Sequence, residues 1–247
     1  MSGDDVVVRQ TLVKCLIYIV SISFAVFLIK RYAKSMRQRF AAWMLNRCIG
    51  FVNKRVHKEK IRLFSSIEND RRIQILEIGA GGGANFEFYP GRSEVTCLEP
   101  NPHCKSYLEE NAPADIQIKT VIQGFAENMT QLGLQDNSFD VVVCTLVLCS
   151  VKDVDRVLFE VKRVLKPGGK FYFMEHIIDD NRLVKSIQKI LNPLWRRMVD
   201  GCQLIRDTPV YIQNAGFDEV KMTKFKFPYL LWPFFVKKFC FGTATKF

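Results

Sequence analysis

The sequence predicts an α/β fold built on a doubly wound, mostly parallel sheet of seven strands. Short apolar runs alternate with helical patterns from about residue 72 onward. The run at 140–151 is almost wholly apolar, as expected of a central parallel strand that is covered on both faces. The first run ends in a turn with four glycines in the five positions 79–83. A glycine-rich turn after the first strand places a ligand at the topological switch point of such a sheet.

The expected elements follow one another along the chain. The strands lie in residues 72–78, 93–100, 116–122, 140–151, 170–178, 216–227 and 235–246. Helical patterns occupy residues 103–112, 154–169, 182–199 and 207–215, with a short helix near 127–134. The helix at 154–169 is amphipathic, and the Pro-Gly-Gly at its end is a typical stop signal.

The net positive charge of the chain is concentrated in one segment. The net charge is +11, and residues 30–62 contribute +10 of it, from 11 lysines and arginines against the single acid Glu59. Residues 1–29 sum to zero, which leaves +1 for residues 63–247. A nearly neutral main domain argues against a broad nucleic-acid-binding face.

An uncharged apolar run, CLIYIVSISFAVFLI, occupies residues 15–29. It approaches the roughly 20 residues that a bilayer span needs. Positive charge follows the run, whereas a cleaved signal peptide carries its charge in front. We therefore expect residues 1–33 to form a retained membrane anchor with a basic flank, which places the main domain in the cytosol. Spanning and lying in one leaflet both stay open, and a buried N-terminal helix of a soluble protein is the alternative.

Residues 34–67 alternate basic with apolar and aromatic side chains at helical spacing. Next to a membrane anchor, such a basic amphipathic helix suits a surface of anionic lipid headgroups. The alternative is a helix whose apolar face packs on the main domain, residues 68–247, and covers a cofactor pocket. The two roles are compatible.

The eight cysteines are scattered, with no CxxC pair and no histidine at zinc spacing. The chain has only three histidines, so we expect no structural zinc site and no metal. Apolar runs such as VVVCTLVLC indicate buried cysteines that act as small hydrophobes, Cys149 among them. A disulfide framework is not expected in a chain of this size.

The glycine-rich turn suits more than one kind of cofactor. Gly79, Gly81 and Ala84 satisfy the loose dinucleotide pattern GxGxxG/A, which alone is a weak signal. Glu77, two residues before the first glycine, places a carboxylate where it would repel a pyrophosphate and attract a cationic amino group. Nothing downstream resembles a substrate domain for hydride transfer. The residues therefore favour a cationic cofactor.

Five motifs in order resemble those of class I S-adenosylmethionine-dependent methyltransferases, whose fold is Rossmann-like. EIGAGGG resembles their first motif, LEP the second, GFAEN the adenine-edge motif, DNSFDVVVCTLVL the fourth, and LKPGG the helix end after it. The resemblance covers residues 70–180. One position departs from the pattern, because many relatives have an acid where this chain has Phe125. The resemblance therefore implies apolar and backbone contacts to adenine here.

A narrower resemblance spans nearly the whole chain. The short apolar N-terminus, the basic helix, EIGAGGGANF, VVVCTLVLCSV, a strand ending in EH and the DGC turn are together similar to the methyltransferase-like protein seven family. The resemblance implies a membrane-associated enzyme of the endoplasmic reticulum and lipid droplets that methylates alkyl thiols.

The resemblance also implies which residues hold S-adenosylmethionine. The glycines let the backbone approach its methionine portion, Glu77 lies near its amino group, and Glu99 accepts hydrogen bonds from both ribose hydroxyls. The predicted contacts are Glu77, Gly79, Gly81, Gly83, Glu99, Pro100, Phe125, Ala126 and Thr145. The structural alternatives are glycines that only turn the chain and a Glu99 that caps the helix after Pro102.

Methyl transfer to a thiol is an in-line displacement that depends chiefly on positioning, and the thiolate needs only a modest base. His176, at the end of the fifth strand, is the candidate for assisting deprotonation, with packing as its alternative role. Asp200 and Cys202, in the DGC turn, are candidates for the acceptor pocket. The aromatic segment 227–235 is expected to dip into the membrane, to close the acceptor site, or to pack at the sheet edge.

We therefore expect an S-adenosylmethionine-dependent methyltransferase that faces the cytosol from the endoplasmic reticulum or lipid-droplet membrane and methylates small lipophilic thiols. The alternatives are a C- or N-methyltransferase of a membrane lipid or quinone, and a lipid-surface scaffold with a vestigial cofactor fold. An NAD-dependent enzyme is a more distant alternative.

Overall fold

A computed structural model describes residues 3–68, 70–227 and 234–247, with side chains from Tyr18 onward apart from Ile19. The chain divides into two compact units, Met1–Met44 and Leu45–Phe247. Helix α1 (Gly3–Phe64) runs through the first unit into the second and is kinked at Val56, where φ is −105° and ψ is 17°. Within the described part of the chain, no helix combines the length and apolarity that a bilayer span requires. The anchor at residues 1–33 thus stays a prediction.

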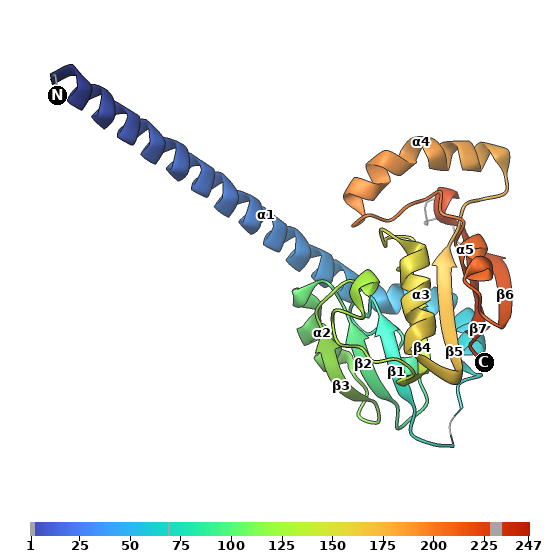
Figure 1. Ribbon diagram of the computed structural model, residues 1–247. Helices are drawn as coiled ribbons and strands as arrows, with labels where there is room; N and C mark the ends of the chain where they lie inside the picture. The colour runs from blue at the N-terminus through green and yellow to red at the C-terminus, as the bar shows by residue number, and fades with distance from the viewer. Residues whose placement is uncertain (1–2, 69, 228–233) are drawn as a thin grey trace. The chain divides into compact units, whose positions relative to one another are not determined.

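The second unit is built on a seven-stranded sheet of order β3-β2-β1-β4-β5-β7-β6 (Figure 1). Its strands are β1 (Gln74–Ile78), β2 (Glu94–Leu98), β3 (Gln117–Ile122), β4 (Phe139–Thr145), β5 (Leu165–His176), β6 (Glu219–Lys226) and β7 (Lys238–Thr245). Strands β1 to β5 are parallel, and β7 runs antiparallel to both β5 and β6. The predicted doubly wound, mostly parallel sheet is confirmed. Its switch point lies where β1 separates β2 from β4.

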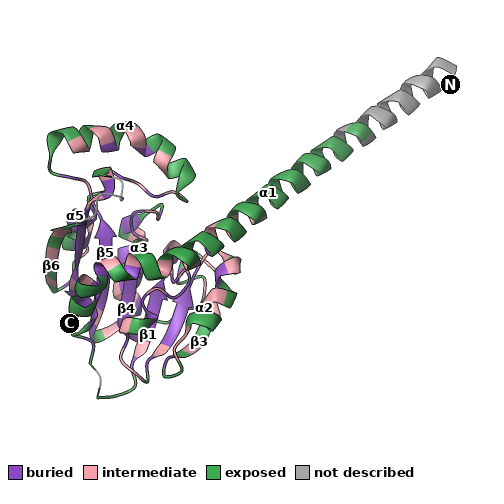
Figure 2. Ribbon diagram, turned by 180° about the vertical axis from the view of Figure 1, so that it is seen from behind, coloured by how far each residue is buried: buried purple, intermediate pink, exposed green. Residues whose placement is uncertain are grey.

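Helices cover both faces of the sheet. On one face, α3 (Val154–Val164) and α5 (Thr208–Asn214) pack in a cluster with the even-numbered residues 76 and 78 of β1 and 142 and 144 of β4. On the other, the end of α1 and α2 (Lys105–Asn111) pack with the odd-numbered residues 75 of β1 and 141 and 143 of β4. This alternation follows from the two-residue repeat of a strand. The two views show α3 on one side of the strands and the end of α1 on the other, with the strands buried between (Figures 1 and 2).

The remaining elements connect these layers. Helix α4 (Arg182–Met198) follows β5, and single turns of 3₁₀ helix form η1 (Phe86–Phe88), η2 (Pro102–Cys104), η3 (Ala126–Asn128) and η4 (Phe234–Val236).

Three predicted elements end earlier than expected. The strand predicted at 140–151 stops at Thr145, because Leu146 has a φ of +60° and the next residues form a turn. The helix predicted at 154–169 stops at Val164, because Leu165 is already extended and opens β5. The helix expected near 127–134 is only the short turn η3, followed by further turns.

The part of α1 that belongs to the second unit has one buried face. Asn53, Val56, Lys60 and Phe64 are each 3–4% exposed and recur every three or four residues, which is the spacing of one helix face. Residues 45–64 therefore pack on the rest of the second unit, as one of the two predicted roles requires. Contact of this helix with lipid stays a prediction.

Candidate active site

The glycine-rich turn leaves β1 with its backbone in the left-handed region. Gly79 donates its N–H to the carbonyl of Leu98 at 2.7 Å, which joins the turn to the end of β2. The φ angles of Gly79, Gly81 and Gly83 are +64°, +54° and +82°. Side chains with a Cβ rarely adopt these angles, so glycine is required by the backbone itself.

The surroundings of the three glycines differ. A Cβ at Gly79 would lie 2.3 Å from a methyl carbon of Val147, and one at Gly83 would lie 2.6 Å from the ring of Phe86. A Cβ at Gly81 would meet no atom closer than the carbonyl oxygen of Gly79, at 4.0 Å. The first and third glycines are thus needed for packing within the protein, whereas Gly81 presents an open surface suited to a ligand.

Glu99 connects the ends of β1 and β2. Its carboxylate is buried and accepts the backbone N–H of Gly81 and of Asn101, each at 2.9 Å and each on a different oxygen. Burial raises the pKa of Glu99, the two amide donors oppose this effect, and the charge of Asp200 adds to it. Each oxygen keeps a lone pair for a further donor, as binding of a ribose diol requires.

The alternative role for Glu99, capping of the helix after Pro102, is wrong. The 3₁₀ turn η2 is capped by Asn101, whose side chain accepts the N–H of His103 at 3.1 Å.

Glu77 lies in a closed network below the turn. Asn85 and Tyr89 each donate to one of its oxygens at 2.8 Å, and its side chain is fully enclosed, which raises its pKa to about 7. Lys60 of α1 lies close enough to lower that pKa, and donates to the carbonyl of Ala84 at 2.9 Å. Burial lowers the pKa of Lys60 to about 8. Glu77 therefore supports the turn, and its contact with a cofactor amino group stays a prediction.

Asn85 offers one buried group to a ligand. Its amide nitrogen donates to both Glu77 and the hydroxyl of Thr145, at 2.8 and 2.9 Å. Its amide oxygen is buried and has no hydrogen-bond partner among the described residues. An acceptor without a donor at this depth is costly unless a ligand supplies the donor. This atom, the open Gly81 and the Glu99 carboxylate fit a cofactor that carries an ammonium group and a ribose.

The other predicted cofactor residues lie at the same edge of the sheet. Pro100 follows Glu99, and the backbone carbonyl of Glu99 accepts the N–H of Gly124 at 3.4 Å, which brings the segment after β3 close. In that segment Phe125 is 57% exposed and Ala126 is buried. The structure thus gathers all nine predicted cofactor residues at the carboxyl ends of β1, β2, β3 and β4.

The turn after β4 is held by a residue that the sequence analysis missed. Glu175, in β5, is fully buried and accepts the backbone N–H groups of Val147 and Leu148 at 2.8 Å and of Cys149 at 3.3 Å. Burial raises its pKa to about 7. The only signal for it in the sequence is an acid inside an otherwise apolar strand, at the EH pair.

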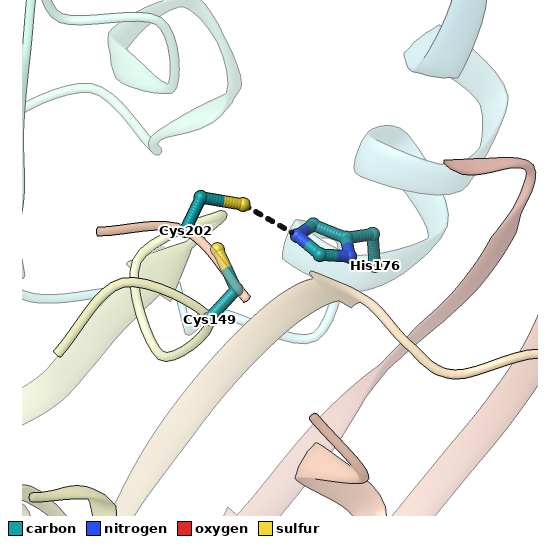
Figure 3. Close-up of side chains that lie close together, drawn as sticks. All are labelled: Cys149, His176 and Cys202. Carbon is teal, nitrogen blue, oxygen red and sulfur yellow. Dashed lines mark hydrogen bonds between the residues drawn. The ribbon is translucent and has the colours of Figure 1, made fainter. Parts of the chain in front are cut away.

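His176 and Cys202 are in contact at the end of β5. The His176 Nε2 and the Cys202 Sγ are 3.0 Å apart, and the Trp195 indole N–H donates to the same sulfur at 3.2 Å. Cys149 lies beside them, and Figure 3 shows the three side chains pointing toward one another. Hydrogen bonding from Cys149, then from His176 and Trp195, lowers the pKa of Cys202. Cys149 is buried, as predicted.

Asp200 is placed differently from Cys202. Its side chain is exposed and its φ is +34°, at a sharp turn after α4. Its role at the acceptor site stays a prediction, as does catalysis by His176. The predicted aromatic segment 227–235 lies for the most part outside the described residues.

A cavity of about 380 Å³ lies at the opposite edge of the sheet. It is lined by residues that include Ser66, Arg71, Asp140, Lys166 and Tyr172. These residues flank the amino ends of β4 and β5, whereas ligands of doubly wound sheets bind outside the carboxyl ends. The cavity is therefore separate from the candidate active site.

Comparisons with known proteins agree with this geometry. Residues 76–173 match the methyltransferase domain family. The thiol S-methyltransferase TMT1A of Homo sapiens is 37% identical over 216 residues, which cover 85% of this chain and 87% of that protein. The thiol S-methyltransferase TMT1B of Rattus norvegicus is 42% identical over 176 residues, covering 68% and 71%.

A crystal structure of a possible histamine N-methyltransferase from Thermotoga maritima shares the fold, with a TM-score of 0.57 and 22% identity over 83% of this chain and 100% of that one. S-adenosylmethionine is thus the methyl donor of this protein. The chain belongs to the thiol S-methyltransferase family of TMT1A and TMT1B, within the class I S-adenosylmethionine-dependent methyltransferases.

Proposed function

We propose that the protein transfers the methyl group of S-adenosylmethionine to small lipophilic thiols. The observation that carries the acceptor class is the 37% identity with a thiol S-methyltransferase across 85% of the chain. The geometry is consistent with it, because the buried side chains of His176 and Cys202 lie at the same sheet edge as the Gly81–Glu99 contact.

The chain's own residues have distinct tasks in this reaction. When bound, S-adenosylmethionine supplies an electrophilic methyl group on a sulfonium sulfur. Glu99 binds the ribose hydroxyls, and the Asn85 amide oxygen accepts from the amino group. His176 assists removal of the acceptor proton at its Nε2, the ring atom that faces Cys202. Because the leaving sulfur departs neutral, alignment of acceptor and methyl group contributes more than charge stabilisation.

The site of action in this proposal is a membrane surface, with the catalytic unit in the cytosol. Between Tyr18 and Ile29, large apolar side chains of α1 are exposed to solvent, for example Phe24 at 60% and Ile29 at 67%. A row of exposed apolar side chains followed by basic residues supports membrane attachment of this segment. The endoplasmic reticulum and lipid droplets are the membranes that the family resemblance favours.

The acceptor class is tested by giving the detergent-solubilised protein labelled S-adenosylmethionine and a matched panel of acceptors. The panel pairs alkyl thiols with alcohols and amines of the same chain length, and adds a quinone and phospholipids. We expect label on the thiols only, increasing with chain length because an apolar acceptor pocket favours longer chains. Label on the quinone or lipid and none on any thiol would overturn the thiol assignment.

The location is tested by expressing the full chain in cells and treating isolated membranes with protease. We expect the protein to pellet with the membranes and its catalytic unit to be digested without detergent. Protection of that unit until detergent is added would reverse the proposed orientation.

A further inference from the structure

Three potential metal ligands meet at the end of β5. The Cys149 Sγ, the Cys202 Sγ and a ring nitrogen of His176 all lie within 4.8 Å of one another, and all three residues are buried (Figure 3). They come from the turn after β4, the last residue of β5 and the turn after α4. Three separate segments of the chain thus converge on one point.

The separations suit a tetrahedral zinc ion. With Zn–S bonds of about 2.3 Å and Zn–N bonds of about 2.0–2.1 Å, neighbouring ligand atoms are roughly 3.5–3.8 Å apart. The cluster brackets this range, from 3.0 Å between His176 Nε2 and Cys202 Sγ to at most 4.8 Å for any pair.

The donor set selects the type of metal. Two thiolates and one imidazole match zinc and other borderline or soft cations, whereas magnesium and calcium prefer oxygen ligands. The Trp195 N–H donates to the Cys202 sulfur at 3.2 Å, as hydrogen-bond donors around metal-bound thiolates do. The His176 Nδ1 is buried with no hydrogen-bond partner among the residues that the structure describes, so this ring is not saturated by the protein.

We propose that Cys149, His176 and Cys202 bind a zinc ion whose fourth coordination position is left for an exogenous ligand. Sites with three protein ligands and one open position are typical of catalytic rather than structural zinc. This part of the inference rests on the proposed function. The exogenous ligand is the sulfur of the acceptor thiol.

The chemistry balances without any further reagent. In the zinc-bound protein His176 is a ligand, so the metal takes over the activation of the acceptor assigned to His176 above. The acceptor R–SH binds the metal as R–S⁻ and its proton passes to solvent. The thiolate sulfur then forms a bond to the methyl carbon while the bond from that carbon to the sulfonium sulfur breaks, and the sulfonium sulfur keeps the electron pair. The product R–S–CH₃ is neutral and a weaker ligand than a thiolate, so it leaves the metal.

The metal site is tested by metal analysis and cobalt substitution of the full-length protein. We expect about one zinc ion per chain, and for the cobalt(II) protein a sulfur-to-cobalt charge-transfer band with intense visible d–d bands of tetrahedral geometry. Cys149→Ser and Cys202→Ser should lose both, while Cys104→Ser, at a buried cysteine outside the cluster, keeps them. Retained binding of S-adenosylhomocysteine confirms that each variant is folded.

The cobalt spectrum is measured on the unmodified protein, so the metal site can be tested even if one of the variants does not fold. Absence of stoichiometric metal, metal retained equally by both cluster variants, or recovery of a Cys149–Cys202 disulfide would each overturn the site.

The open position is tested by adding an alkyl thiol to the cobalt protein. The d–d bands should shift with the thiol and stay unchanged with the corresponding thioether. An unchanged spectrum with the thiol would overturn its place at the metal. Full thiol methylation by metal-free protein would overturn the inference while the proposed function stands.

A separate feature, helix α4, carries an exposed apolar stripe. Its residues Leu183, Ile190, Leu194 and Met198 are 60–76% exposed. Their spacing places them on one face of the helix, together with the half-buried Ile187. The face that packs on the fold is a different one and includes Gln188 and Asn192, both buried. Figure 2 shows α4 as a mainly exposed helix.

Basic residues flank this stripe. The helix contains five basic residues and no acidic one: Arg182, Lys185, Lys189, Arg196 and Arg197. A helix with an apolar face, a basic face and no acid is complementary to an anionic lipid surface. We propose that α4 lies in the headgroup region of an anionic membrane, with its apolar stripe inserted.

The test must separate α4 from the N-terminal segment. An environment-sensitive fluorophore is attached to Leu194→Cys in a Cys48→Ser background, and to Gln135→Cys, an exposed site far from α4, as the matched control. The labelled Cys48→Ser parent gives the background. On phosphatidylcholine vesicles that contain phosphatidylserine, the emission at position 194 should shift to the blue and that at position 135 should not.

Weakening of the blue shift at high salt is expected, because the basic residues contribute attraction that salt screens. If the protein sediments with the vesicles and the emission at position 194 is unchanged, α4 does not contact the membrane and the proposal fails. An equal shift at position 135 would also overturn it.

Discussion

The carboxylate of Glu99 accepts the backbone N–H of Gly81 at 2.9 Å, so the end of β2 holds the turn that follows β1. We propose that the same carboxylate also receives the ribose of the cofactor. Under this proposal one side chain both shapes the turn and binds the ligand, and substitutions must be chosen to separate the two roles.

Glu99→Gln is expected to weaken cofactor binding by roughly 10- to 100-fold. The variant keeps one carbonyl oxygen for a backbone amide but loses the charge that strengthens hydrogen bonds from the ribose, each worth about 1.5–3 kcal/mol. Calorimetric titration with S-adenosylhomocysteine measures the change. Glu94→Gln, at the opposite end of β2 and paired with surface cations, is the control and should bind normally. Equal affinity of the two variants would show that the ribose contact lies elsewhere.

Gly79→Ala should destabilise the protein more than Gly133→Ala. Both glycines have positive φ, +64° and +80°, so each alanine costs about 1–2 kcal/mol in backbone strain. Only at Gly79 does the new Cβ meet a neighbour, Val147, and overpacking adds about 1–3 kcal/mol. Denaturant unfolding gives the free energy of unfolding of each variant, and the difference between the two variants is the cost of overpacking against Val147. Equal losses of unfolding free energy would mean that Val147 and the turn after β4 move aside at no energetic cost.

Glu77 makes stability depend on pH in a defined direction. Its folded pKa of about 7 is above the ordinary 4.5 because burial disfavours the charged form. Its contribution to stability is therefore fully present below about pH 4.5 and is lost as the pH rises through about 7, a change on the order of 3 kcal/mol.

Glu77→Gln does not titrate, so its stability relative to the unmodified protein should improve between about pH 5 and about pH 8. Comparing the two proteins at each pH cancels the contributions of other groups, Lys60 included, to a first approximation. Parallel pH profiles would show that Glu77 stays ionised throughout, held so by Lys60.

Glu175→Ala should unfold the turn after β4. The substitution leaves the three backbone N–H groups of residues 147–149 buried without an acceptor, at about 1–3 kcal/mol each. Because Val147 packs against Gly79, we expect cofactor affinity to fall as well. Glu175→Gln keeps one acceptor oxygen, so its amide protection and cofactor affinity should lie between those of the unmodified protein and the alanine variant. Hydrogen exchange of these three amides reports the effect, and unchanged protection would contradict it.

Much of the fold is predictable because strand and helix periodicities are local. The apolar residues of β4 and the Pro-Gly-Gly near the start of β5 are visible in the sequence. The ends of some elements differ from the prediction because a change in backbone conformation ends the element while the sequence pattern continues. The apolar run after Thr145 continues without interruption, yet the positive φ of Leu146 ends the strand, and composition does not reveal it.

The grouping of the candidate cofactor residues was predictable for a similar reason. Glu77 lies near the carboxyl end of β1, the three glycines follow that strand, Glu99 follows β2, and parallel strands bring their carboxyl ends together. The cluster of Cys149, His176 and Cys202 has no such local signature, since 27 and 26 residues separate its members along the chain. Only the packing of the two turns against the end of β5 brings them together.

The unequal surroundings of Gly79 and Gly81 bear on how such chains change over evolutionary time. Val147 makes any side chain at Gly79 destabilising whether or not the protein still binds its cofactor. A descendant that had lost catalysis would thus inherit this glycine unchanged. Gly81 has no neighbour to exclude a small side chain, and asparagine tolerates its left-handed backbone. In a lineage that has lost catalysis, substitutions should therefore appear at position 81 before they appear at position 79.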